Sequence, residues 1–324
     1  MQRVAVFGAS GPIGQAQVKE LLKRGIDTVA ITRNGSILSR PEFLGAEIRP
    51  ADYFDPDSLT KALAGVESVF FQPPGLLSPT SWAQPAGNVC SAAVKAGVKR
   101  LILNSTQWAP DAGTLSGQPT YDATSAMEDL FASSGLELVV FRPVLYMENL
   151  LTLFWKPPIV EEGVYRYCHR PGMEANWICM DDVAQFMVAG LTRDELTGRR
   201  FTLGGPERLP IEEVVQVLSA VMGRPLKFEY MPPREFGHYI VKRLTADIGA
   251  ERATSIMGND PGGLAEFLHE FYEFNNYSPM RPFEVDMTKV LKIIPIELTT
   301  LRKWAGKQDW TSAYPKIRSG TRIL

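Results

Sequence analysis

The sequence lacks what a protein of an oxidising compartment or of a membrane usually carries. Its 324 residues include three cysteines, Cys90, Cys168 and Cys179, an odd and scattered set that makes no disulfide framework. No apolar run approaches the ~20 residues that span a bilayer. The first residues lead directly into a strand and a glycine motif, which leaves no room for a signal peptide. These features predict a cytoplasmic protein without membrane attachment.

An excess of charge of either sign is also missing. Thirty-four lysines and arginines stand against 36 acidic residues, a net charge of −2. Because nucleic acids and acidic membranes are bound by basic surfaces, direct nucleic-acid binding is not expected and a small molecule is the favoured partner. Histidine is scarce as well. Cys168, His169 and Cys179 lack the short repeated spacing of zinc ligands, so no metal site is predicted.

What the first half does contain is an alternation of strand and helix. Short β-rich runs stand at residues 3–7, 28–32, 47–50, 68–71, 100–104 and 137–141, and helix-forming runs at 14–23, 55–64, 82–96 and 123–133. Runs such as Val4-Ala5-Val6-Phe7 are continuously apolar, which is typical of parallel strands covered by helices on both faces. The predicted class is therefore α/β, with a doubly wound parallel sheet of the Rossmann type.

The pattern changes near residue 145. Aromatic and proline-rich segments follow, with helices expected at 181–191 and 211–222, a strand at 201–203 and mostly helix over 228–290. We expect a Rossmann domain over residues 1–150. Residues 151–324 are expected to form a smaller α/β lobe for substrate or partner, with late core elements interleaved.

The most informative motif follows the first strand and opens the first helix. It consists of Gly8, Ala9, Ser10, Gly11, Pro12, Ile13 and Gly14. Glycines permit a tight turn and close approach of the backbone to a pyrophosphate, and the helix N-terminus offers unpaired N–H groups. A purely structural glycine turn is the alternative. The position in the first strand–helix turn favours dinucleotide binding.

The end of the second strand indicates which dinucleotide is bound. NAD-binding proteins usually carry Asp or Glu there to hold the ribose 2′-hydroxyl. This chain has Thr32, Arg33 and Asn34 instead. An arginine can pair with a 2′-phosphate through its planar fork, whereas a carboxylate would repel it. Unless Arg33 is only a solvated surface residue, the predicted cofactor is NADP(H).

Residues after the other strands should complete the crevice, because ligands of such sheets bind at the carboxyl ends of the strands. They are Asp52 and Tyr53, then Gln72, Pro73 and Pro74, then Asn104 and Ser105. Asp52 either reaches the adenine amino group or serves as a turn residue. The two prolines either stiffen a loop beside the pyrophosphate or form an ordinary turn.

Several of these segments together resemble the NmrA-like family of atypical short-chain dehydrogenases. They are the start VAVFGASGPIGQ, the strand end AITRN, the runs GAEIRPADYFDPDSL and FRPVLYMENLL, and later MDDVAQFMVAGL and GGPERLPIEEVVQVLSAVMGRPL. The resemblance spans nearly the whole chain. It implies NADP(H) bound at the positions above, with Tyr146, Met147, Glu148 and Asn149 lining the nicotinamide end. Alternatively, Tyr146 packs and Asn149 caps a helix.

The catalytic position departs from the short-chain dehydrogenase pattern. Those enzymes use Tyr-x-x-x-Lys, in which the lysine lowers the pKa of the tyrosine so that it can pass a proton. Here Tyr121 is followed by Ser125, and alignment with the NmrA-like pattern places the family's lysine on Thr124. The proton donor is therefore unassigned. Tyr121 and Tyr146 are candidates, as are the histidines 169 and 238, whereas Asp181-Asp182 is expected to cap a helix.

The family resemblance implies two kinds of function. Some members reduce double bonds, imines, quinones or dyes; others sense the dinucleotide or act as transcriptional co-regulators without chemistry. The aromatic stretch between Tyr146 and Trp177 is either a wall for a ring-containing ligand or a packed interface. We expect an NADP(H)-dependent oxidoreductase for a small apolar or aromatic metabolite. The alternative is a non-catalytic sensor, and the macromolecular partner considered is another protein or a second copy of this chain.

Overall fold

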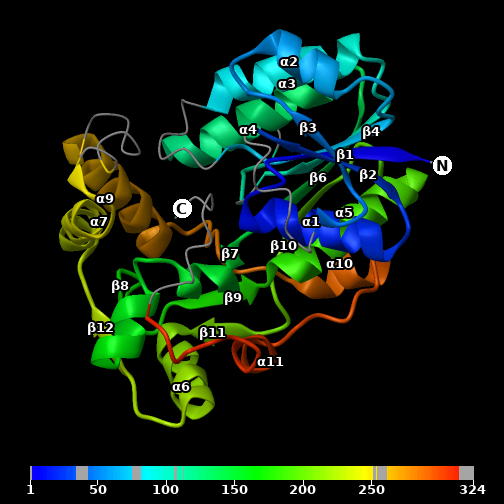
Figure 1. Ribbon diagram of the computed structural model, residues 1–324. Helices are drawn as coiled ribbons and strands as arrows, with labels where there is room; N and C mark the ends of the chain where they lie inside the picture. Colours follow the sequence, from blue (N-terminus) through cyan, green and yellow to red (C-terminus); the bar gives the residue numbers. More distant parts are fainter. Residues whose placement is uncertain are drawn as a thin grey trace.

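A sheet of seven parallel strands organises the first half of the molecule (Figure 1). The computed structural model describes residues 2–33, 43–74, 82–105, 108–111, 113–250, 253 and 261–313. Within them the strand order is β10-β6-β5-β4-β1-β2-β3. The strands are β1 (Arg3–Phe7), β2 (Asp27–Thr32), β3 (Glu47–Pro50), β4 (Ser68–Phe71), β5 (Arg100–Asn104), β6 (Glu137–Pro143) and β10 (Arg200–Leu203). All neighbouring pairs are parallel, as predicted.

Helices cover both faces of this sheet. The helices α2 (Pro56–Ala62), α3 (Ala83–Lys95) and α4 (Pro119–Ala132) lie on one face, and α1 (Pro12–Lys23), α5 (Met180–Thr192) and α10 (Met287–Ile293) on the other (Figure 1). Alternate residues of β1 face the two helical layers. Ala5 and Phe7 pack with α2, α3 and α4, whereas Val4 and Val6 pack toward α1 and α5. The predicted doubly wound sheet is confirmed.

The direction of winding reverses at β1, which lies between β2 and β4. In open α/β sheets this switch point opens a crevice at the carboxyl ends of the strands, where ligands bind. The topology therefore brings the residues that follow β1, β2, β3, β4 and β5 to one edge of the sheet.

The second half holds two small sheets and a helical layer (Figure 1). One sheet joins β7 (Leu145–Tyr146), β9 (Glu174–Ile178) and β11 (Arg208–Pro210), and the other pairs β8 (Val164–Tyr167) with β12 (Lys227–Tyr230). The helices are α6 (Ile211–Met222), α7 (Pro233–Ile248), α9 (Pro261–Tyr277) and α11 (Leu301–Ala305). Helices α7 and α9 pack closely, because a Cβ at Gly237 would come within 2.4 Å of the Ala265 carbonyl oxygen.

Some boundaries differ from those read from the sequence. Helix α1 begins two residues earlier than expected, at Pro12, and α4 begins four residues earlier, at Pro119. Proline is favoured at this first position because its missing N–H has no intrahelical partner there. The small-sheet strands β7, β8, β9, β11 and β12 were not predicted. Strand β10 and helix α5 come after residue 150 in the chain. In the structure, β10 is a strand of the seven-stranded sheet and α5 is one of the helices that cover it.

Candidate functional site

The glycine turn after β1 packs directly against the start of α1. Gly8 has a φ of +63°, and its carbonyl oxygen accepts a hydrogen bond from the N–H of Gly11 at 2.9 Å. The N–H of Ala9 donates to the carbonyl of Ile31, which ties the turn to β2. A Cβ at Gly14 would lie 2.3 Å from the Gly8 oxygen. Only glycine fits at that approach, so the helix begins immediately beside the turn.

The N-terminus of α1 is open. Gly11 occupies the N-cap position and no side chain caps the helix among the described residues. The side-chain amide of Gln15 donates to the carbonyl of Ser10 at 2.7 Å and so fixes the preceding loop. The first-turn N–H groups of a helix have no intrahelical acceptor, and they carry the positive end of the helix dipole. The turn can therefore receive an anionic group.

A chain of buried amides supports the turn from below. The Nε2 of Gln72 donates to the carbonyl of Phe7 at 2.9 Å, and its Oε1 accepts from Nε2 of Gln17 at 2.8 Å. Gln17 is buried in α1, and it was not predicted as a site residue because its only signal is a polar side chain on an inward helix face. Gln72 thus links the end of β4 to the end of β1. The next two residues in the chain are Pro73, which is buried, and Pro74, which is half-buried.

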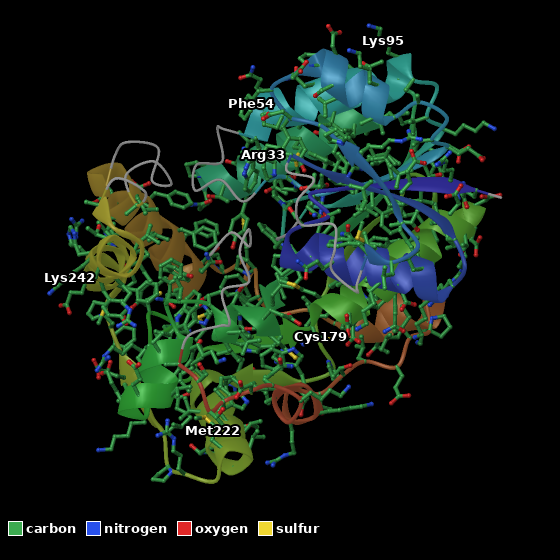
Figure 2. All side chains as sticks on the ribbon, in the orientation of Figure 1. Arg33, Phe54, Lys95, Cys179, Met222 and Lys242 are labelled. Atoms are coloured by element: carbon green, nitrogen blue, oxygen red, sulfur yellow. The ribbon has the colours of Figure 1, made fainter. Side chains whose placement is uncertain are left out.

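The residues after β2 and β3 surround the outer part of the crevice. Thr32 donates from Oγ1 to the Ser10 hydroxyl at 3.2 Å. Arg33 is exposed and pairs with no carboxylate of the described chain (Figure 2); Asn34 lies outside the described residues. Asp52 accepts from the N–H of Phe54 at 2.9 Å, which is the turn role considered above. The ring of Tyr53 stacks on Phe7 with centroids 5.8 Å apart.

On the nicotinamide side of the predicted crevice, β5 and β7 are joined by Asn104 and Tyr146. The Nδ2 of Asn104 donates to the Tyr146 hydroxyl at 3.0 Å, and that hydroxyl lies 3.2 Å from Asn104 Oδ1. Both residues are buried, and burial raises the pKa of Tyr146, so its hydroxyl stays protonated. Ser105, the next residue after β5, donates to the carbonyl of Phe141.

The segment that follows Tyr146 forms a short 3₁₀ turn, Met147–Leu151. The carboxylate of Glu148 accepts from the N–H of Met180 at 3.2 Å and from Nε1 of Trp304 at 3.0 Å. Burial raises the pKa of Glu148 to about 7. This carboxylate therefore accepts a hydrogen bond from the first residue of α5 and links it to Trp304 in the C-terminal segment. Asn149 is half-buried, and its carbonyl accepts from Thr152.

The helix cap expected from Asp181-Asp182 is not formed by those residues. Helix α5 begins at Met180 and both aspartates lie in its first turn, without a side-chain cap from the N-cap residue. Asp181 pairs with Lys19 at 2.9 Å. Asp182 is buried and accepts from the N–H of Thr299 at 2.7 Å. The carboxylate that reaches the helix start is Glu148, from a distant part of the chain.

The candidate proton donors lie in different surroundings. Tyr121 is fully buried, its hydroxyl is 2.5 Å from Oδ1 of Asn275, and burial raises its pKa. Thr124, which the family resemblance aligns with the lysine, donates to the carbonyl of Thr120. His169 is buried against Tyr167, and burial lowers its pKa to about 3, so it is neutral. His238 is exposed on α7.

The aromatic stretch between Tyr146 and Trp177 is mostly core. Tyr165, Tyr167 and Trp177 are no more than 2% exposed and share one apolar cluster with residues of α6, α7 and α9. Rings so enclosed have no surface for a ligand. The packed-interface alternative therefore fits this stretch.

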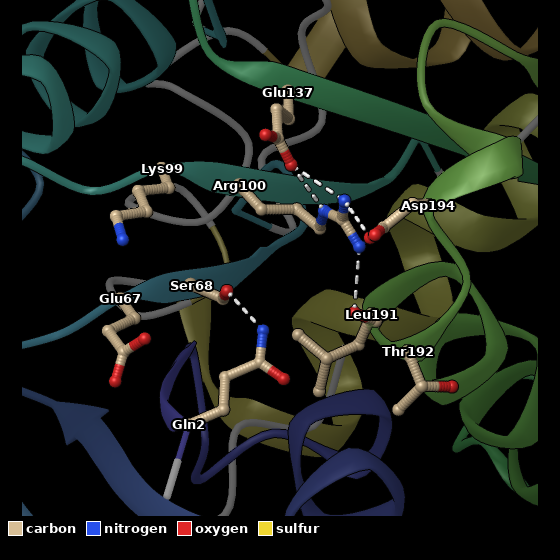
Figure 3. A pocket seen from close by; sticks show the side chains of 9 residues that line it. All are labelled: Gln2, Glu67, Ser68, Lys99, Arg100, Glu137, Leu191, Thr192 and Asp194. Atoms are coloured by element: carbon tan, nitrogen blue, oxygen red, sulfur yellow. Dashed lines mark hydrogen bonds and ion pairs between the residues drawn. The ribbon is translucent and has the colours of Figure 1, made fainter.

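Neither of two cavities in the described chain is lined by the glycine turn or by the residues that follow β2 to β5. One, of about 380 Å³, is at the amino edge of the sheet (Figure 3). There Arg100 donates to the carbonyl of Leu191 and pairs with Glu137 and Asp194, so its donors are occupied. The other, of about 990 Å³, is lined by β9, β11 and α10 residues. No cluster of metal-ligating side chains occurs in the described chain. Nor does any described helix have the length and apolarity to span a membrane.

The strand order and the glycine turn at the switch point are those of a Rossmann-type protein. More narrowly, the chain belongs to the NmrA-like family, whose profile matches residues 1–304. This agrees with the resemblance drawn from the sequence motifs.

Two named relatives agree with this placement, and a solved structure has the same fold. A (4-alkanoyl-5-oxo-2,5-dihydrofuran-3-yl)methyl phosphate reductase of Streptomyces griseus is 32% identical over 70% of this chain and 76% of its own. An NAD(P)H azoreductase of Xenophilus azovorans is 26% identical over 83% of this chain and 86% of its own. The NADPH complex of an Escherichia coli quinone oxidoreductase superposes with a TM-score of 0.72 at 24% identity, covering 93% of this chain and 98% of its own.

Proposed function

We propose that this protein is an NADP(H)-dependent reductase of a small acceptor that contains a ring or a conjugated double bond. The observation that carries the proposal is the uncapped start of α1 behind the glycine turn, with Arg33 unpaired by any described carboxylate at the end of β2. Relatives named as reductases, one of 32% identity, support the same activity.

We assign the parts of the cofactor to the crevice residues by position. The turn Gly8–Gly14 would hold the pyrophosphate on the helix N-terminus. Arg33, with Thr32 beside it, would bind the 2′-phosphate through charge-assisted hydrogen bonds. Asp52 and Tyr53 border the adenine end, Gln72 and its prolines the pyrophosphate, and Asn104, Ser105 and Tyr146 to Asn149 the nicotinamide end.

The reaction has to proceed without a tyrosine–lysine pair. When bound, NADPH supplies a hydride. Among the described residues no cation acts on Tyr121, whose hydroxyl donates to Asn275, and Thr124 donates its hydroxyl to the helix backbone. The acceptors that suit such a site can take a hydride without a strong acid beside them. A quinone delocalises the negative charge that the hydride brings, and an iminium cation becomes a neutral amine. Tyr146 stays protonated, and its hydroxyl would donate a hydrogen bond to the acceptor by exchanging Asn104 Oδ1 for it.

A cytoplasmic location fits this proposal. Cys90, Cys168 and Cys179 are all free and buried, as in proteins of reducing compartments. A small-molecule substrate, and not a macromolecule, is the proposed partner.

Calorimetric titration with NADPH, NADP, NADH and NAD tests the cofactor, and NADPH oxidation followed with a quinone, an azo dye and a cyclic enone tests the reaction. Binding of NADPH at least tenfold tighter than NADH, with turnover of one acceptor class, is expected. Binding without turnover of any acceptor would favour a sensor. No binding of any of the four nucleotides would overturn the proposal.

A further inference from the structure

Helix α9 presents a row of phenylalanine rings toward the first half of the molecule. Phe267, Phe271 and Phe274 follow the i, i+4, i+7 spacing of one helix face. The rings of Phe271 and Phe274 lie 5.5 and 5.8 Å from the ring of Tyr121 in α4, and Phe267 stacks on Phe271 at 6.0 Å. All three are half-buried, unlike Tyr272 on the core side of the helix. The row is therefore incompletely covered.

A fourth ring reaches the same place from the sheet. Trp108 follows β5, is half-buried, and meets Tyr121 edge-on with centroids 5.1 Å apart. Its segment is fixed from beneath, because the carbonyl of Ala109 accepts from Nη1 of Arg142. Arg142 is itself held in a buried ion pair with Glu128. Trp108 thus lies on a hydrogen-bonded segment, three residues beyond Ser105 in the chain.

The position of α9 is set by two consecutive buried asparagines. Asn275 accepts from the Tyr121 hydroxyl at 2.5 Å and donates from Nδ2 to the carbonyl of Phe271. Asn276 donates to the carbonyl of Cys168 at 2.7 Å and accepts from the N–H of Arg170 at 3.0 Å. The helix is therefore held between α4 and the segment after β8, with its phenylalanine row toward Tyr121.

An acidic side chain borders the ring-bearing face. Glu266 and Glu273 of α9 are exposed and lie on another side of the helix, whereas the exposed Glu270 lies one turn from both Phe267 and Phe274. The flat rings themselves offer stacking and edge-to-face contacts to a flat apolar ligand. Of these rings, Trp108 lies closest in the chain to Asn104 and Ser105, the strand end where the nicotinamide is proposed to lie.

We propose that Trp108, Phe267, Phe271 and Phe274 form the wall that binds a flat aromatic hydride acceptor, and that Asn275 is a positioning residue for this wall. The inference rests on the proposed function, since it gives the acceptor class of that same site. The acceptor stacks against α9 and faces the carboxyl edge of the sheet.

The test uses anthraquinone-2-sulfonate as the probe, titrated by calorimetry into the full chain saturated with NADP, so that no turnover occurs. The double variant Phe267→Leu/Phe271→Leu should raise the probe Kd at least tenfold and leave NADPH affinity within about twofold. Phe228→Leu, which shortens a half-buried ring on β12, is the matched control and should leave the probe Kd unchanged. If the double variant does not fold, Trp108→Leu carries the same expectation from outside α9.

The results that would overturn the aromatic wall differ from those that would overturn the reductase activity. A wild-type protein that does not bind the probe, or ring variants that bind it as wild type does, would overturn the wall even if NADPH is oxidised. Probe binding that is lost in the ring variants supports the wall even if no acceptor is turned over. Asn275→Leu should raise the KM for a naphthoquinone several-fold with kcat nearly constant, and an unchanged KM would remove its positioning role.

Discussion

The hydroxyl of Tyr121 lies 2.5 Å from Oδ1 of Asn275, so the tyrosine that we matched to the catalytic position of short-chain dehydrogenases is hydrogen-bonded to helix α9. Both residues are buried, and 154 residues separate them in the chain. In the usual enzyme this hydroxyl is activated by a lysine and faces the substrate. Here it has a neutral amide as its partner and rings around it. The position has become a contact between the two halves of the molecule.

Tyr121→Phe should therefore keep kcat for NADPH oxidation within a few-fold of wild type. The change removes the hydrogen bond and leaves Asn275 Oδ1 without this donor, which should cost about 1–3 kcal/mol of unfolding free energy. Steady-state kinetics and urea denaturation measure both. A fall of kcat by several orders of magnitude would show that the hydroxyl acts in the reaction. Combining it with Asn275→Leu should cost less than the sum of the two single changes.

Arg33→Ala should weaken NADP(H) binding by one to two orders of magnitude and change NAD(H) binding little. The reason is that a charge-assisted contact to phosphate is worth about 1.5–3 kcal/mol, and only NADP(H) has the 2′-phosphate. Calorimetric Kd values for the four nucleotides measure the difference. Arg302→Ala, on the distant helix α11, controls for the loss of one surface charge. Equal losses for both cofactors would remove the 2′-phosphate role of Arg33.

Gly14→Ala should abolish tight NADPH binding and destabilise the protein. The added Cβ would lie 2.3 Å from the Gly8 oxygen and 2.7 Å from the Cα of Ala9, so backbone has to move in the turn itself. Gly87→Ala is the matched control, because Gly87 lies within α3 and a Cβ there meets nothing within 4 Å. It should raise stability by about 0.5–1 kcal/mol. Thermal unfolding and NADPH titration of both variants check this, and normal binding by Gly14→Ala would contradict it.

The sequence was informative where signals are local. The strands of the central sheet are continuously apolar because both faces are buried. Most site residues were predicted from their position just after a strand, and Tyr146 to Asn149 from the family resemblance. The parallel topology then carries those positions to one edge. The same reasoning failed for β11, only Arg208–Pro210, and for the other short strands of the second half. Such strands show no periodicity, and their pairing depends on distant segments.

The roles of Asp182 and Glu148 could not be predicted from the sequence, because their partners lie far away in the chain. Asp182 follows the start of a helix and looked like a cap, yet its carboxylate binds Thr299, 117 residues away. Glu148 lies in a family motif beside the proposed nicotinamide site, yet it binds the indole of Trp304, 156 residues away. No spacing within either motif encodes these partners. They become visible only when the C-terminal segment is placed against α5.

Glu148 gives the protein a pH-dependent stability that can be isolated. Its pKa is raised to about 7 by burial, with Asp181 adding to the rise, whereas a glutamate of the unfolded chain has a pKa of about 4.3. Between these values the folded state binds more protons, so the free energy of unfolding falls as pH rises through this window. The loss should reach about 4 kcal/mol and be complete about one pH unit above 7.

Glu148→Gln should remove this slope and keep the contact, because an amide oxygen can still accept from Met180 and Trp304. Guanidinium denaturation of wild type and variant at pH 5 and pH 8 measures it, since all other titrating groups cancel in the difference. Glu270→Gln, exposed on α9, should retain the full wild-type slope. If Glu148→Gln shows the wild-type pH dependence, the carboxyl is already ionised at pH 5, and its hold on α5 and Trp304 is that of an ordinary charged acceptor.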